Sequence, residues 1–130
     1  MTQRLDLYRC ETCGNIVQVL VAGDGELVCC GHPMTYMEPH KNDDNANEKH
    51  VPVFVKLENG EEEIRVGSLP HPMEQEHYIQ FIEAVSNDER YVCLKFLNPG
   101  DEPVKKLHCA SDIKNAIAYC NIHGLWEGKK

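Results

Sequence analysis

Four cysteines near the N-terminus constrain the fold of this chain more than any other feature. Cys10 and Cys13 form a Cys-x-x-Cys pair followed by Gly14, and Cys29 and Cys30 are adjacent to each other further along. Gly14 is free to take a positive φ where the chain turns around a metal. A segment of about 36 residues cannot be stabilised by burial alone, so metal binding is expected to supply much of its folding free energy. The sequence therefore predicts a small metal-binding module at the start of the chain.

The chemistry of the four thiols leaves more than one kind of centre open. The chain has seven cysteines, an odd number, so complete pairing within one chain is impossible. Disulfides rarely persist in the cytoplasm, and a bond between the neighbours Cys29 and Cys30 would strain the backbone. A structural zinc site and an iron held by four thiolates both fit the spacing.

After a polar stretch at residues 38–46, which we interpret as a linker, the sequence indicates β-structure. Runs typical of strands occupy residues 51–57, 62–66, 78–85, 91–97, 104–110, 116–120 and 125–127, and Asn59-Gly60 is a hairpin turn. About seven short strands with turns between them predict an immunoglobulin-like β-sandwich or barrel. Residues 111–119 are the exception, because Ser111 followed by spaced apolar residues is also compatible with a helix.

Charge and hydropathy exclude several classes of partner. The formal net charge of −8 argues against nucleic acid, which requires a basic face. No apolar run approaches the roughly 20 residues needed to span a bilayer. The polar start Met1-Thr2-Gln3-Arg4 does not resemble a signal peptide, so a cytoplasmic location is expected.

A second set of candidate ligands is spread over the larger segment. Cys120 and His123 lie three positions apart and are followed by Gly124. Three further imidazoles lie upstream, at His50, His71 and His77. These five candidates are one more than a structural zinc site uses. The remaining histidines and cysteines are interpreted as surface or satisfied core residues and as small buried side chains; they are His32, His40, His108, Cys93 and Cys109.

Five separated motifs together resemble the two-iron superoxide reductases, also called desulfoferrodoxins. The motifs are Cys10-x-x-Cys13-Gly14, Cys29-Cys30-Gly31-x-Pro33-Met34, Glu48-Lys49-His50-Val51-Pro52, His71-Pro72-Met73 with His77-Tyr78-Ile79, and Cys120-Asn121-x-His123-Gly124-Leu125-Trp126. Phe81 departs from the pattern, since the family has Trp there. The resemblance covers nearly the whole chain.

The resemblance implies an all-β protein with two domains and two iron centres. A desulforedoxin-like domain at residues 1–37 would hold Fe(Cys)4, and a catalytic β-sandwich at 38–130 would hold Fe(His)4Cys. The implied ligands are Cys10, Cys13, Cys29 and Cys30 for the first iron, and His50, His71, His77 and His123 in a plane with axial Cys120 for the second. The resemblance also favours a strand over a helix at residues 116–120.

The implied activity is one-electron reduction of superoxide to hydrogen peroxide, a detoxification of reactive oxygen. Lys49 would attract the anionic substrate, and Glu48 would ligate the oxidised iron. Rubredoxin or a similar protein is the implied electron donor, and a homodimer is the implied assembly. Two other functions remain open from the residues alone: a pure electron carrier and a zinc-stabilised interaction module.

Overall fold

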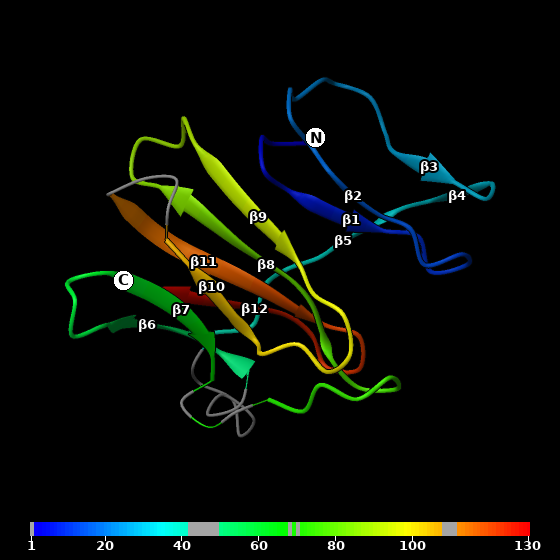
Figure 1. Ribbon diagram of the computed structural model, residues 1–130. Coiled ribbons are helices and arrows are strands. Elements are labelled where there is room, and N and C mark those ends of the chain that lie inside the picture. Colours follow the sequence, from blue (N-terminus) through cyan, green and yellow to red (C-terminus); the bar gives the residue numbers. More distant parts are fainter. Residues whose placement is uncertain (1, 42–49, 68, 70, 108–111) are drawn as a thin grey trace. The chain divides into compact units, whose positions relative to one another are not determined.

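A computed structural model describes residues 2–41, 50–67, 69, 71–107 and 112–130, and their regular elements are all strands (Figure 1). The all-β prediction is therefore confirmed. The chain divides into two compact units, Met1–Glu38 and Pro39–Lys130. The stretch interpreted as a linker lies largely outside the described residues. Within the described part, no helix has the length and hydropathy needed to cross a membrane.

The first unit is built from short strands around a very small core. A three-stranded antiparallel sheet has the order β2-β1-β5, and β3 pairs with β4; the strands are β1 (Leu7–Arg9), β2 (Ile16–Gln18), β3 (Val28–Cys29), β4 (His32–Pro33) and β5 (Thr35–Tyr36). Its buried apolar residues in the described range are Leu7, Cys10 and Val19. Burial alone therefore contributes little to the stability of this unit.

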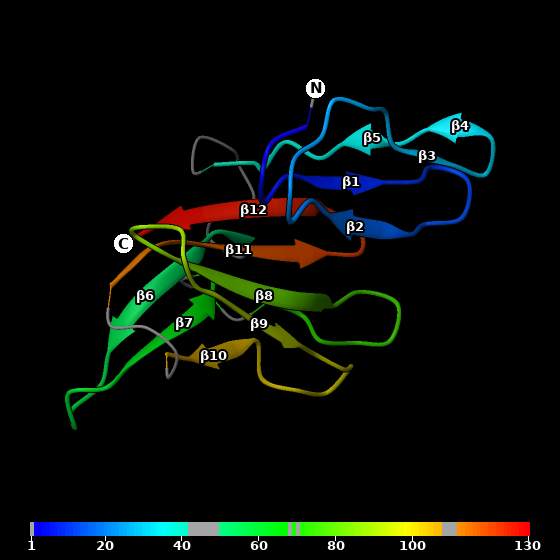
Figure 2. The same cartoon turned by 90° about the horizontal axis from the view of Figure 1, so that it is seen from above.

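The second unit is a sandwich of two antiparallel sheets, as predicted. One sheet has the order β10-β7-β6 and the other β12-β11-β8-β9. Their strands are β6 (Pro52–Lys56), β7 (Glu62–Val66), β8 (Ile79–Ser86), β9 (Val92–Phe96), β10 (Val104–Lys106), β11 (Ile113–Cys120) and β12 (Gly124–Lys129). The possible helix at residues 111–119 is wrong over residues 113–119, because these residues belong to β11, which pairs with both β8 and β12, and residue 111 lies outside the described residues. In both views the β6–β7 hairpin lies beside the β8–β11 pair (Figure 1, Figure 2).

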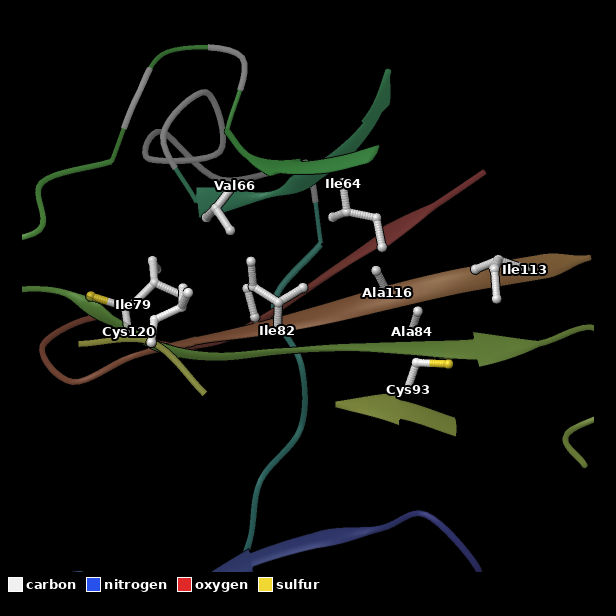
Figure 3. Packing of buried hydrophobic residues seen from close by; sticks show 11 residues of the cluster. Ile64, Val66, Ile79, Ile82, Ala84, Cys93, Ile113, Ala116 and Cys120 are labelled. Carbon is white, nitrogen blue, oxygen red and sulfur yellow. The ribbon is translucent and has the colours of Figure 1, made fainter. Parts of the chain in front are cut away.

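The hydrophobic core fills the space between these sheets. Ile64 and Val66 project from β7 toward Ile82 and Ala116 of the opposite sheet (Figure 3). Cys120, the last residue of β11, is a member of this cluster with no exposed surface. The thiol of Cys120 is therefore part of the hydrophobic core.

Cys93 lies in the same cluster, as expected for a small buried side chain. It is also disulfide-bonded, which differs from the prediction of a simple apolar role. Residues 108–111, which include His108 and Cys109, lie outside the described residues.

Gly128 has no room for a side chain, because β12 packs there against the start of β6. A Cβ atom at position 128 would lie 1.9 Å from the carbonyl oxygen of Pro52. Since the obstacle is backbone, Gly128→Ala is expected to lower the free energy of unfolding of this unit by about 3 kcal/mol. Denaturant unfolding measures the loss. The same unfolding midpoint for Gly128→Ala and the parent would contradict the prediction, and Gly23→Ala, where a Cβ meets nothing within 4 Å in the first unit, should leave the midpoint of the second unit unchanged.

Candidate metal centres

The second unit gathers its five candidate ligands into one group. The ligand atoms of His50, His71, His77, Cys120 and His123, called here the five-residue group, all lie within 4.8 Å of one another. Sequence reasoning proposed the same five residues, although 73 positions separate His50 from His123. The structure brings together every one of them.

The four imidazoles follow one another in a closed circle. Ring centroids are 4.6 Å apart for His50 and His71, 4.8 Å for His71 and His77, 5.0 Å for His77 and His123, and 4.7 Å for His123 and His50. Each ring is therefore next to two others. The thiol of Cys120 is the fifth donor, with its Sγ 3.8 Å from Nδ1 of His123.

Local structure explains why these residues meet. Cys120 ends β11, and His123 lies in the turn that leads to β12, where Gly124 has a φ of 87°. That left-handed conformation suits glycine. The backbone N–H of His123 donates to Cys120 Sγ at 3.4 Å, which fixes the turn around the sulfur.

His71 and His77 both lie in the segment between β7 and β8, and His77 is at the end of a second tight turn. Glu74 and His77 exchange both backbone hydrogen bonds at 3.0 Å. The Asn121 side chain holds the same turn: its Oδ1 accepts the N–H of Tyr78 at 3.0 Å and its Nδ2 donates to the carbonyl of Glu76 at 3.0 Å. Asn121 thus links the Cys120 turn to the residues on both sides of His77. Its place between two ligands was the only sign of this role in the sequence.

The donor atoms of the group fit a metal ion. Nε2 of His71 and Nε2 of His77 are buried with no hydrogen-bond partner in the described part of the chain. Buried polar nitrogens are rarely left unpaired, and a metal would satisfy both. His71 Nδ1 lies 2.7 Å from the carbonyl oxygen of Pro72, so Nδ1 carries the proton that it donates and Nε2 keeps its lone pair.

Burial also sets the protonation of the group. It lowers the pKa of His71 to about 4, so this imidazole is neutral, as a metal ligand must be. Burial raises the pKa of the Cys120 thiol. A bound cation would reverse that shift, because a coordinating thiol is deprotonated outright.

Trp126 contacts this group, and His40 contacts Trp126. Trp126 is stacked on His50 with ring centroids 4.8 Å apart, and His40 packs on Trp126 at 4.7 Å. Sequence reasoning gave Trp126 no role and placed His40 and His32 among surface or satisfied core residues. Both histidines are indeed exposed, but His40 has this contact in addition.

The first unit holds the second candidate centre. The sulfur atoms of Cys10, Cys13, Cys29 and Cys30, called here the four-cysteine group, lie within 4.8 Å of one another. All four are free thiols, which excludes a disulfide among them. Cys10 is buried, whereas Cys13 and Cys30 are exposed. Four thiols at this spacing suit a tetrahedral metal.

The backbone accommodates two adjacent ligands by a left-handed turn. Cys30 has a φ of 54° and Gly31 a φ of 76°. A left-handed conformation costs a residue with a side chain roughly 1–2 kcal/mol, so the geometry of the four sulfurs is maintained against local strain. The N–H of Cys13 donates to Cys10 Sγ at 3.5 Å and lowers the pKa of Cys10 to about 6, which favours the thiolate.

Two further site residues named from the sequence, Glu48 and Lys49, lie outside the described residues. Phe81 is stacked on Tyr119 with ring centroids 5.7 Å apart, and Tyr119 directly precedes Cys120.

Comparison with known proteins agrees with both halves of the chain. Residues 2–37 match the family described as the desulfoferrodoxin N-terminal domain, and residues 42–129 match that described as desulfoferrodoxin. The chain is 50% identical to a desulfoferrodoxin homolog from Archaeoglobus fulgidus over 127 residues, which covers 98% of each protein. It is 34% identical over 105 residues to a superoxide reductase from Pyrococcus abyssi, covering 68% of this chain and 91% of that protein.

The fold also has a solved counterpart over its full length. The crystal structure of the superoxide reductase from Treponema pallidum aligns with a TM-score of 0.74, covering 99% of this chain and 100% of that one. At 24% identity this likeness concerns the fold alone.

Proposed function

This chain belongs to the desulfoferrodoxin family, and we propose that it is a superoxide reductase. Each superoxide anion would take up one electron and two protons to give hydrogen peroxide, without release of dioxygen. The observation that carries this proposal is the five-residue group, with four imidazoles and one thiol within 4.8 Å. A superoxide reductase among the relatives, at 34% identity, supports the same activity.

The chain has residues for two iron centres. We assign the four-cysteine group to Fe(Cys)4 and the five-residue group to Fe(His)4Cys. An iron in the latter would supply one-electron chemistry with a coordination position left for a small anion. The neutral imidazoles and the Cys120 thiolate would bind it, and zinc cannot replace it because zinc does not change valence.

The residues before His50 would handle the substrate and the resting state. A chain with a net charge of −8 repels superoxide unless a local cation attracts it, and Lys49 would provide that cation. The same ammonium group would orient a proton donor toward the reduced product. The Glu48 carboxylate would occupy the remaining ligand position of the oxidised metal. Both roles are proposed from their sequence position beside His50.

Mixing the reduced protein with superoxide tests the function. We expect stoichiometric peroxide without dioxygen, because the chain would only reduce its substrate. Lys49→Ile should slow capture of superoxide and weaken its salt dependence, since a steering charge is lost. Glu48→Ala should leave capture near that of the parent and change the ferric absorption spectrum.

Other outcomes would contradict these assignments. Evolution of dioxygen indicates a dismutase, and absence of any reaction indicates an electron carrier. A colourless zinc protein would end the iron assignment. Unchanged capture in Lys49→Ile would remove the steering role, and an unchanged ferric spectrum in Glu48→Ala would remove the ligand role.

Finer assignments follow from the family. We propose that residues 1–37 form a desulforedoxin-like domain and residues 38–130 the catalytic domain. The electron donor would be rubredoxin or a similar protein, the assembly a homodimer, and the location cytoplasmic. Sedimentation of the holoprotein tests the dimer, and a strictly monomeric protein would refute it.

A further inference from the structure

We propose that Trp126 is a positioning residue that orients two members of the five-residue group at once, and that His40 holds Trp126 in place. The proposal rests on the assignment of the five-residue group as a metal site, and it does not depend on superoxide being the substrate. Neither residue has a donor atom in the group.

The indole contacts the group in two different ways. Its ring is stacked on the imidazole of His50 with an interplanar angle of 26° and centroids 4.8 Å apart. Its Nε1–H donates to the carbonyl oxygen of His123 at 3.1 Å. One side chain therefore restrains a residue just before β6 and a residue in the turn before β12. These two residues are also direct neighbours, because His50 Nε2 lies 3.0 Å from His123 Nδ1.

Trp126 is well suited to act as a fixed support. It is 2% exposed, and it lies in β12 opposite Ala118 of the central strand β11. The strand begins at Gly124, directly after His123, so the indole and the turn belong to one short rigid segment. A side chain anchored in this way loses little further freedom when it orients a neighbour.

His40 contacts the same indole and also holds the backbone of Trp126. Its ring lies 4.7 Å from that of Trp126, tilted by 39°. Its backbone brackets the same residue: the N–H of His40 donates to the carbonyl of Leu125 at 2.8 Å, and the N–H of Glu127 donates to the carbonyl of His40 at 2.8 Å. The indole thus contacts both the exposed imidazole of His40 and the buried imidazole of His50.

Loss of this support should weaken metal binding in the folded protein. Groups that orient metal ligands typically change metal affinity by about 10- to 100-fold when they are removed. Trp126→Leu removes both the stacked ring and the N–H donor. Trp126→Phe keeps a ring and removes only the donor. His40→Ala removes the outer contact, and His40→Phe restores an aromatic ring there.

Loss of iron to a chelator, measured on the purified holoprotein, tests the proposal. The absorption of each iron centre is followed separately, so the four-cysteine group is an internal control in the same molecule. Trp126→Leu should lose iron from the five-residue group about 10- to 100-fold faster than the parent, with a shifted ferric spectrum. Trp126→Phe and His40→Ala should give intermediate rates, and His40→Phe should approach the parent. Phe54→Leu, which removes an aromatic ring packed on the core from β6, should retain iron normally.

The other outcomes either overturn this inference or separate it from the proposed function. Parent-like iron retention and spectra in Trp126→Leu and Trp126→Phe would overturn the proposal. If Trp126→Leu does not fold, the donor variant Trp126→Phe still tests it. A parent that holds iron in the five-residue group but does not reduce superoxide refutes the proposed function and leaves this inference standing. A parent without iron in that group refutes both.

Discussion

Cys120→Ser is expected to lower the rate of superoxide reduction by more than about 100-fold, while the absorption spectrum of the four-cysteine centre stays unchanged. The thiol of Cys120 has no exposed surface and is the only sulfur in the five-residue group. A serine hydroxyl is a far poorer anionic donor than a thiol, so the electron density that a thiolate supplies to the metal is lost. Removal of a residue that only orients a ligand already lowers metal affinity or activity by about 10- to 100-fold. Removal of a ligand itself should therefore lower the activity by more than that.

Rapid mixing with superoxide and visible spectroscopy measure this effect together. The sulfur-to-iron absorption of the five-residue group should disappear, because only Cys120 can produce it. Cys13→Ser is the reciprocal control, since Cys13 is an exposed member of the four-cysteine group. It should alter the other spectrum and spare the five-residue group. A parent-like rate for Cys120→Ser would refute the assigned role of this thiol.

Removal of metal from the four-cysteine group should unfold the first unit and leave the second folded. The described part of the first unit buries only Leu7, Cys10 and Val19 among its apolar residues, whereas the second has an extended core. Structural zinc contributes about 10–16 kcal/mol to the folding of zinc-finger peptides of comparable size. Without a comparable contribution, three buried side chains cannot offset the conformational entropy of about 36 residues.

Limited proteolysis of the metal-free protein tests this expectation. Cleavage should concentrate between residues 2 and 38 and spare the strands of the second unit. Addition of Zn²⁺ should restore protection of the first unit without restoring a redox-active centre, because zinc holds the sulfurs but does not change valence. A first unit that stays protected without metal would show that its stability comes from elsewhere.

The strand that was predicted best has an alternating sequence. Glu62–Val66 was predicted with the observed bounds, because apolar Ile64 and Val66 flank the charged Arg65, although Glu63 is buried beside Ile64. The two-residue strands β4 and β5 were not predicted, because two residues are too few to show a period. Residues 111–119 fitted a helix and a strand equally well. In the structure this segment is a strand, because Ile117 pairs with Glu83 on one side and with Glu127 on the other. Both partners lie on other strands, so the local sequence pattern does not reveal them.

The sequence by itself determined which side chains form the two groups. Imidazoles and thiols are chemically distinct, and the motifs that resemble the desulfoferrodoxins selected nine of the fourteen as candidate ligands. Only the tertiary structure decided how they are arranged and supported. The circle of imidazoles, the hydrogen bonds of Asn121 and the contacts of Trp126 with His40 and His50 depend on which strands pair and in which register. Such contacts join residues far apart in the chain, and their geometry exists only after the sheets have formed.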